Sequence, residues 1–380
     1  MINFDNSATT FPKPRSVKAA SAAALEKYGG NPGRGGHAIS LASANAVFRA
    51  RENIADFFGA SPENVVFTLN CTHALNLAIK GVLKPGDHVI ISSFEHNSSA
   101  RPVHALSRSG VKYSIAEVFP ESALTVESFR SLIRPDTKAI VCTIGSNVTG
   151  QIMPFLELGM LAEKHGLCFI ADGAQACGVI PVKLSDGINI LCTAGHKALY
   201  GPTGTGLLIS DGKFPITPIM EGGTGSASIE LEQPDFLPDS LESGTVNTAG
   251  IIALNAGVDF VRKLTLKKIF THETALCRQF ISGISDLDSV IIYRERNANY
   301  LPIVLFNIKG MPSDETASAL NDMGFALRGG LHCSGLAHKS LGTLPNGGVR
   351  FAPSVMNSSA EVAKLVSAVR KLAASYNKKH

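Results

Sequence analysis

The feature of this sequence that most constrains its fold is the alternation of short apolar runs with longer helical patterns. The apolar runs lie at 65–69, 88–92, 139–143, 168–171, 189–192 and 206–209. Several are almost continuously apolar, which is typical of strands buried on both faces of a parallel sheet. Helical patterns lie between them, such as 43–58, for which Ser43 is the expected N-cap. The alternation predicts an α/β fold with a doubly wound, mostly parallel sheet and helices on both faces.

A different pattern begins after the last of these runs. A long helical stretch at 249–281 is expected to connect two domains. Strands are expected at 290–293 and 303–308, and a helix at 314–323. This pattern predicts a second, smaller α+β domain.

Capping residues mark the ends of the later helices. Ser313 is the expected N-cap of one helix, Gly324 follows its end, and Ser358 and Glu361 form a capping box for the last helix.

The sequence predicts three parts: an N-terminal arm at 1–15 that packs with the small domain, a large domain at 16–260, and a small C-terminal domain at 261–380.

Composition excludes several classes of partner. The chain has 380 residues, 17% of them charged, and a net charge of only +4, with no basic run longer than the terminal Lys378, Lys379 and His380. Nucleic acid is therefore not an expected partner. There is no apolar stretch of membrane-spanning length and no apolar leader at the start, so we expect a cytoplasmic protein without a membrane partner.

Seven cysteines are scattered along the chain without a CxxC pair. This spacing argues against a disulfide framework and against a thiolate zinc site. Cys333 is the exception, because it is set among glycines and beside His332. Together with His338 these two residues offer metal-ligand types, but no fourth ligand is evident and we expect no metal.

An aspartate and a lysine follow two successive apolar runs. Asp172 comes directly after the run at 168–171, and Lys197 follows the next run. The carboxyl ends of strands are where open α/β sheets bind ligands. Taken singly, the aspartate could cap a helix and the lysine could lie in a surface loop. The ordered pair favours a site for pyridoxal 5'-phosphate (PLP), with Lys197 as Schiff-base lysine and Asp172 at the ring nitrogen.

The phosphate of such a cofactor needs donors at a helix N-terminus. The segment 70–76 follows an apolar run and opens a helix, so the Thr72 hydroxyl is a candidate, with Thr193 and His196 as further candidates. His96 ends another apolar run, where its ring could stack on the cofactor. A hydrogen-bonded structural histidine is the alternative interpretation.

Three motifs carry a resemblance to a known family: Asp172-Gly-Ala-Gln-Ala, Gly195-His-Lys-x-Leu-Tyr-Gly-Pro-Thr-Gly, and Glu242-Ser-Gly-Thr-Val-Asn-Thr. Together they resemble the class V aminotransferase-like, fold-type I PLP-dependent transferases. Within these, the chain resembles the cysteine desulfurase/selenocysteine lyase family over nearly its whole length.

The segment from Arg328 to Ser334 resembles the Arg-x-Gly-x-His-Cys segment that carries the nucleophile of the desulfurases. The resemblance implies that Cys333 attacks the sulfur of L-cysteine, which leaves L-alanine and a persulfide. A positive group beside the thiol favours the thiolate, and His332 or Arg328 could supply it. Arg350 matches the arginine that binds the substrate carboxylate. The short spacing between Cys333 and Arg350 resembles the Suf-type group.

The resemblance implies further residue roles. Lys197 and His96 would be catalytic with Cys333. The cofactor-binding residues would be Lys197, Asp172, Gln175, Cys71, Thr72, His96, Asn147, Thr193, His196 and Thr245. The substrate-binding residues would be Arg350, Asn147, Arg328 and Ala8.

The same resemblance implies a homodimer, in which the Thr245 region reaches the cofactor phosphate of the other subunit. It also implies a sulfur-acceptor protein and a link to iron–sulfur cluster assembly. The chain departs from the common Suf-type pattern at Gly33, Cys71 and Leu331.

Alternatives stay open at this point. A lyase acting on L-selenocysteine would use the same site. A class V aminotransferase or epimerase would need Lys197 but not Cys333, so the His-Cys pair speaks against it. A protein without activity, which only binds PLP or carries sulfur, is disfavoured because the lysine, aspartate, arginine and cysteine are all present.

Overall fold

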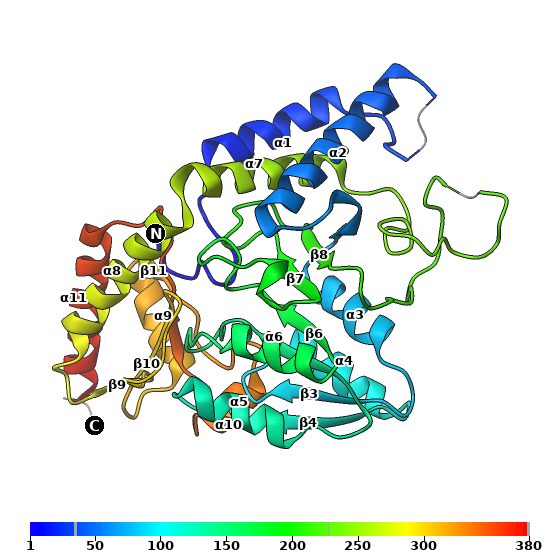
Figure 1. Ribbon diagram of the computed structural model, residues 1–380. Helices are drawn as coiled ribbons and strands as arrows, with labels where there is room; N and C mark the ends of the chain where they lie inside the picture. The colour runs from blue at the N-terminus through cyan, green and yellow to red at the C-terminus, as the bar shows by residue number, and fades with distance from the viewer. Residues whose placement is uncertain (34–35, 227, 378–380) are drawn as a thin grey trace.

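A seven-stranded sheet forms the centre of the larger unit in the computed structural model, which describes residues 1–33, 36–226 and 228–377 (Figure 1). The strand order is β2-β8-β7-β6-β5-β3-β4. The strands are β2 (Val65–Thr68), β3 (His88–Ser92), β4 (Lys112–Ala116), β5 (Thr137–Thr143), β6 (Cys168–Asp172), β7 (Ile190–Ala194) and β8 (Gly206–Ser210). Only β8 runs antiparallel to its neighbours. The predicted mostly parallel sheet is confirmed.

Helices cover both faces of this sheet. The helices of the larger unit are α1 (Arg15–Lys27), α2 (Ala38–Phe58), α3 (Cys71–Val82), α4 (Asn97–Ser107), α5 (Ser122–Ser131), α6 (Phe155–Lys164) and α7 (Thr248–Leu264), with short 3₁₀ turns at Pro62–Asn64 and Leu184–Asp186. One face packs against α2, α5, α6 and α7, through residues such as Ile54 and Leu158. The other packs against α3 and α4, through Leu75 and Val103. The doubly wound arrangement is therefore confirmed.

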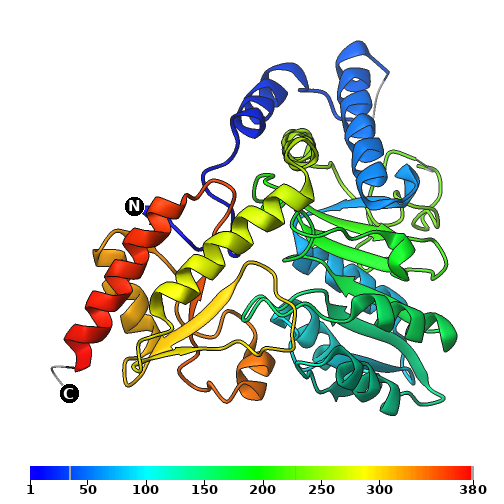
Figure 2. The same cartoon turned by 60° about the vertical axis from the view of Figure 1, so that its left-hand side comes forward.

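The smaller unit is an antiparallel sheet covered by helices. Its strands have the order β12-β10-β9, with β9 (Val290–Ile292), β10 (Val304–Ile308) and β12 (Val349–Phe351). Its helices are α8 (Leu266–Ile284), α9 (Ser313–Asp322), α10 (Gly335–Ser340) and α11 (Ser359–Asn377). Figure 2 shows α8 and α11 side by side at the outer edge of the molecule. The Phe280 ring stacks on Phe351, with centroids 4.3 Å apart, at the centre of this core.

The N-terminal segment joins the smaller unit although it starts the chain. Strand β1 (Ile2–Asn3) pairs in parallel with β11 (Phe325–Ala326), and Asp5 bridges to Ala352. The segment then reaches the larger unit, where the backbone N–H of Thr10 donates to the His196 carbonyl at 3.2 Å. The limits proposed for the three parts stay a prediction.

Several predicted helix boundaries are wrong. The helix expected from Ser43 begins at Ala38, and the His37 ring caps it by accepting the Ser40 N–H. Apolar side chains in its first turns, such as Ile39 and Leu41, are exposed. They do not follow the core-facing pattern from which the start of the helix was predicted. The stretch at 249–281 is two helices, because Thr265, at φ 70°, leaves the helical conformation.

Ser313 is the first residue of α9 rather than its N-cap, because its hydroxyl accepts the distant Gly330 N–H. The capping box at Ser358 and Glu361 is confirmed, with contacts of 2.8 and 3.3 Å. The tail at 378–380 lies outside the described residues. None of the described helices is long and apolar enough to span a membrane.

A buried ion pair ties α2 to the sheet and to the segment before α7. Both guanidinium Nη atoms of Arg51 contact the Glu242 carboxylate, at 2.7 and 2.8 Å, and both side chains are more than nine-tenths buried. The same carboxylate accepts the Phe67 N–H at 2.6 Å.

We expect Arg51→Ala to lower the free energy of unfolding by about 3–5 kcal/mol, because it leaves the Glu242 carboxylate buried without its cation. Urea unfolding measures this. Arg130→Ala is the matched control, since it breaks an exposed pair with Glu127 that is typically worth about 0.2–1 kcal/mol. Equal losses in the two variants would contradict the prediction.

Candidate active site

A cavity of about 230 Å³ lies where the parallel strands end, between the two units. The carboxyl ends of β5, β6 and β7 and the N-termini of α3 and α4 form its floor. The predicted site residues that line it are Ala8, Cys71, Thr72, His96, Asn147, Asp172, Gln175, His196, Lys197, Arg328 and Arg350. The structure therefore brings together side chains from both units and from the N-terminal segment.

Three predicted residues do not line this cavity. Cys333 is exposed at its mouth, next to Arg328. Thr193 lies in the core, and its hydroxyl donates to the Gly173 carbonyl at 3.3 Å. Thr245 lies in a separate groove of about 450 Å³, where its hydroxyl accepts from Asn31 at 3.2 Å. A role for Thr245 in the site of a second subunit stays a prediction.

Asp172 is the last residue of β6, and Lys197 follows the end of the adjacent strand β7. The Asp172 carboxylate is buried, and its Oδ1 accepts from the Ala174 N–H at 2.9 Å and from the Cys71 thiol at 3.4 Å. Burial lowers the pKa of the Lys197 amine, against the opposing charge of Asp172. Desolvation therefore favours the neutral amine, which is the form that can react as a nucleophile or a base.

His96 caps α4 and is neutral. Its Nδ1 accepts the Ser98 N–H at 3.0 Å, so the neutral ring carries its proton on Nε2. Burial is the main cause that lowers the pKa of His96 to about 4. The Ser98 hydroxyl lies 2.7 Å from Nδ1 and 2.8 Å from the Thr72 hydroxyl. A hydrogen-bonded chain thus joins the N-terminus of α3 to the ring.

The end of the cavity near α3 has donors suited to an anion. Thr72 lies in the first turn of α3, whose cap is Asn70, with Oδ1 accepting the His73 N–H at 2.9 Å. The His196 ring also faces the cavity, and burial lowers its pKa to about 4. Its Nδ1 is buried without a hydrogen-bond partner among the described residues. An unpaired buried polar atom in this position fits a polar group of a ligand.

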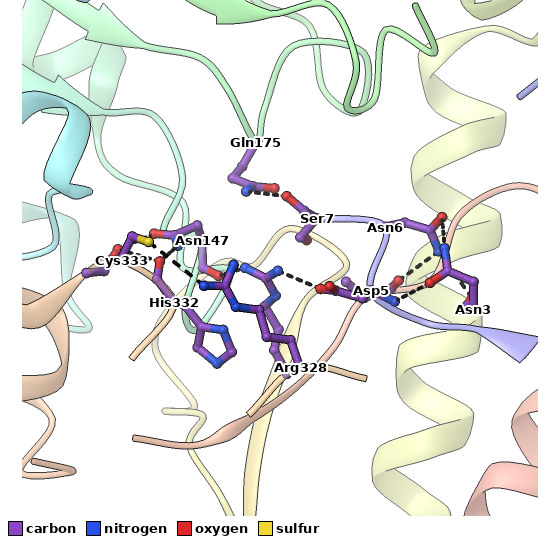
Figure 3. Close-up of polar contacts among 12 residues, drawn as sticks. Asn3, Asp5, Asn6, Ser7, Asn147, Gln175, Arg328, His332 and Cys333 are labelled. Carbon is purple, nitrogen blue, oxygen red and sulfur yellow. Dashed lines mark hydrogen bonds and ion pairs between the residues drawn. The ribbon is translucent and has the colours of Figure 1, made fainter. Parts of the chain in front are cut away.

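Arg350 is a buried cation on β12. Its Nη1 donates to the Asn147 carbonyl at 2.9 Å, and its Nη2 pairs with Asp5 at 2.7 Å. Its Nε is buried without a partner in the described part of the chain. Figure 3 shows Asp5 directed toward this part of the site from the N-terminal segment. Arg350 thus keeps a free donor for a carboxylate, although one side of the guanidinium is already occupied.

Cys333 lies at the mouth of the cavity in a strained loop. Both His332 (φ 49°) and Cys333 (φ 56°) adopt the left-handed conformation, which costs a non-glycine residue about 1–3 kcal/mol. The Nη2 of Arg328 lies 3.8 Å from the Cys333 sulfur, as Figure 3 shows. The guanidinium thus places a positive charge beside the sulfur.

The prediction that His332 could supply this positive charge is wrong. Its Nε2 donates to the Gly348 carbonyl at 3.0 Å, and burial lowers the pKa of the ring to about 2. The His338 ring lies 5.8 Å away and bonds to Thr343. Among the described residues there is no group of three or more metal-ligating side chains.

Two acidic residues were missed by the sequence reasoning. Asp5 is the partner of Arg350, and only the fold reveals a pairing across the length of the chain. Glu95 is completely buried beside His96, where its carboxylate accepts from the Ser92 and Ser99 hydroxyls and from the Thr143 N–H. It joins the ends of β3 and β5 to α4. Its place directly before His96, just after the apolar run at 88–92, was the available signal.

A lysine and an aspartate at neighbouring strand ends of a doubly wound sheet, closed by a small α+β unit, define the fold-type I class of PLP enzymes. A family model, aminotransferase class-V, matches residues 2–365. The chain is 30% identical to a probable cysteine desulfurase of Pyrococcus abyssi, over 98% of this chain and 94% of that protein. It is 28% identical to another from Methanothermobacter thermautotrophicus, over 97% and 94%.

Solved structures agree with these relatives. The apo cysteine desulfurase of Thermococcus onnurineus superposes with a TM-score of 0.90 at 30% identity, over 98% of this chain and 95% of that one. A cysteine desulfurase of Escherichia coli gives 0.86 at 25%, over 97% and 94%. The chain therefore belongs to the aminotransferase class-V family. The predicted resemblance to the cysteine desulfurases is confirmed.

Glu95 predicts a pH dependence of stability. Burial is the main cause that raises its pKa from 4.5 to about 7. Between these values the unfolded chain has lost the proton that the folded chain keeps, so stability falls as pH rises. We expect Glu95→Gln to remove this contribution. Urea unfolding at pH 5 and pH 8 should show wild-type stability falling relative to the variant, and a constant difference would contradict the prediction.

Proposed function

We propose that this chain is a PLP-dependent cysteine desulfurase that moves the sulfur of L-cysteine onto Cys333 and releases L-alanine. The observation that carries this proposal is the position of Cys333. It lies at the mouth of the cavity that contains Lys197 and Asp172, with an arginine beside its sulfur. A class V aminotransferase or epimerase would have no use for a nucleophile in that place.

The residues of the cavity fit the cofactor. Lys197 would hold it, Asp172 would pair with its ring nitrogen, and Gln175 and His96 would lie against the ring. Thr72 and His196 would receive the phosphate, and the unpaired His196 Nδ1 supports this placement. Thr245 of a second subunit would complete the phosphate site in a homodimer. When bound, PLP supplies an electron sink for charge that develops at the substrate α-carbon.

The substrate carboxylate would bind at Arg350. We infer a contact through N–H groups of the guanidinium that are left unused, because Asp5 and the Asn147 carbonyl each take only one of them. Lys197, whose neutral form burial favours, would take the α-proton. The Nε2 proton of the neutral His96 would serve as a hydrogen-bond donor in the cavity.

Cys333 would perform the sulfur transfer. Its thiolate form, with the Arg328 guanidinium beside the sulfur, attacks the substrate sulfur. As the new S–S bond forms, the C–S bond breaks, and its electron pair stays with the carbon fragment, which is later protonated to alanine. The exposed position of Cys333 supports transfer of the persulfide sulfur to an acceptor protein.

Borohydride treatment of the PLP-loaded protein should fix the cofactor on Lys197. The physical reason is that burial keeps this amine reactive, whereas surface lysines stay protonated. Peptide mass spectrometry locates the adduct. Lys197→Ala should abolish it, and Lys213→Ala, which removes an exposed lysine, should leave it unchanged. An adduct on another lysine of the wild-type protein would refute the assignment.

Cys333→Ser tests the reaction itself. A serine hydroxyl is a poor nucleophile toward sulfur, so the variant should retain PLP but form almost no alanine from L-cysteine and carry no persulfide. Alanine release and alkylation mapping of the modified peptide measure both results. L-selenocysteine serves as a comparison, because its weaker C–Se bond depends less on the thiol. A variant that forms alanine from cysteine at the wild-type rate would point to a lyase independent of Cys333.

A further inference from the structure

The loop that carries the nucleophile is held in place by the larger unit. His332 and Cys333 are consecutive non-glycine residues in the left-handed region, at φ 49° and φ 56°. Such conformations persist only where surrounding contacts determine them. The backbone N–H of Asn97, the first residue of α4, donates to the Cys333 carbonyl at 2.8 Å. One of these contacts therefore comes from the helix that His96 caps.

Asn147 supplies the second contact. Its Nδ2 donates to the His332 carbonyl at 2.8 Å, as Figure 3 shows, and its Oδ1 accepts from the Ser334 hydroxyl at 2.7 Å. Both ends of one side-chain amide thus bind the residues on either side of Cys333. The amide still has one N–H that is available to a cofactor.

Ser334 holds the oxygen end of this amide. The His332 carbonyl can only accept, so it takes the nitrogen end of Asn147, and the Ser334 hydroxyl donates to the opposite Oδ1. Without the hydroxyl, Oδ1 would lose this donor and the amide would be fixed at its nitrogen end alone. Ser334 itself is completely buried, and its hydroxyl donates to Asn147 and lies 3.5 Å from the His332 carbonyl.

Asn147 also holds the candidate carboxylate anchor. Its backbone carbonyl accepts Nη1 of Arg350 at 2.9 Å. Asn147 therefore contacts both the loop that carries the attacking sulfur and the arginine that would bind the substrate carboxylate. Any turn of its side chain moves the nucleophile relative to a substrate held at Arg350.

We propose that Ser334 is a positioning residue for the sulfur-transfer step, acting through Asn147 to hold the Cys333 sulfur at the required distance from the bound substrate. The proposal rests on the proposed desulfurase function. It predicts a defect confined to the step that uses Cys333, with cofactor and substrate binding unaffected.

The test compares two substrates in Ser334→Ala. We expect kcat for L-cysteine to fall on the order of tenfold or more, since small displacements of reacting groups are costly. KM and PLP content should stay within about twofold, and turnover of L-selenocysteine, which depends less on the thiol, should fall much less. Ser43→Ala is the matched control, because it removes an equally buried hydroxyl in α2 whose one side-chain bond in the described part of the chain is to the Ile39 carbonyl.

A second variant guards against a folding defect. Ser334→Thr keeps a hydroxyl that can donate to Asn147, so it is expected to retain the cysteine turnover that Ser334→Ala loses. Unchanged cysteine turnover in Ser334→Ala, or equal fractional losses with both substrates, would overturn the positioning role. A wild-type protein that makes no alanine from cysteine would instead overturn the proposed function.

Discussion

The buried charge of Arg350 is the constraint on which the closed site depends. Removing an ion from water costs several kcal/mol unless partners compensate for it. Arg350 is only 2% exposed, and its partners are Asp5 and the Asn147 carbonyl. They come from the N-terminal segment and from the turn after β5, whereas Arg350 itself belongs to the smaller unit. The charge is compensated only when all three parts have assembled, so the cavity and the fold form together.

The positive character of the site lies in groups that do not titrate near neutral pH. Burial keeps His96, His196 and His332 neutral, with pKa values lowered to about 4, 4 and 2. Arg328 and Arg350 carry the charge, and a guanidinium keeps it across the physiological range. The histidine before the nucleophile therefore acts through its hydrogen bond to Gly348, which holds the loop, rather than through its charge.

The parts of the fold that the sequence predicts are those governed by local pattern. Buried strands such as β6 and β7 are almost continuously apolar, and their ends locate Asp172 and Lys197. Strand β4 was missed because it is a sheet edge with exposed side chains, so its residues lack that pattern. Ser313 was misassigned for a related reason: its hydroxyl serves a distant contact with Gly330 rather than the local cap.

The candidate site was predictable as a set of residues but not as a geometry. The pairing of Asp5 with Arg350 and of Asn147 with Ser334 joins segments that no spacing rule connects. Thr193 was a predicted candidate for the cofactor phosphate, yet its side chain is buried in the core and its hydroxyl donates to the Gly173 carbonyl. Residue types suffice to indicate the chemistry. Which buried donor pairs with which acceptor depends on how the distant segments pack in the folded chain.

Under the proposed function, the fixed position of Cys333 at the mouth of the cavity determines where its sulfur is transferred to an acceptor. The contacts of Asn97, Asn147 and Ser334 hold the Cys333 loop on both sides, and its strained backbone would lose its support if the loop moved away. The sulfur would therefore be handed over where it is first bound, at an exposed position. An acceptor would have to bring its own thiol to Cys333, and its access would depend on the exposed Leu331 and on the Arg328 charge beside the sulfur.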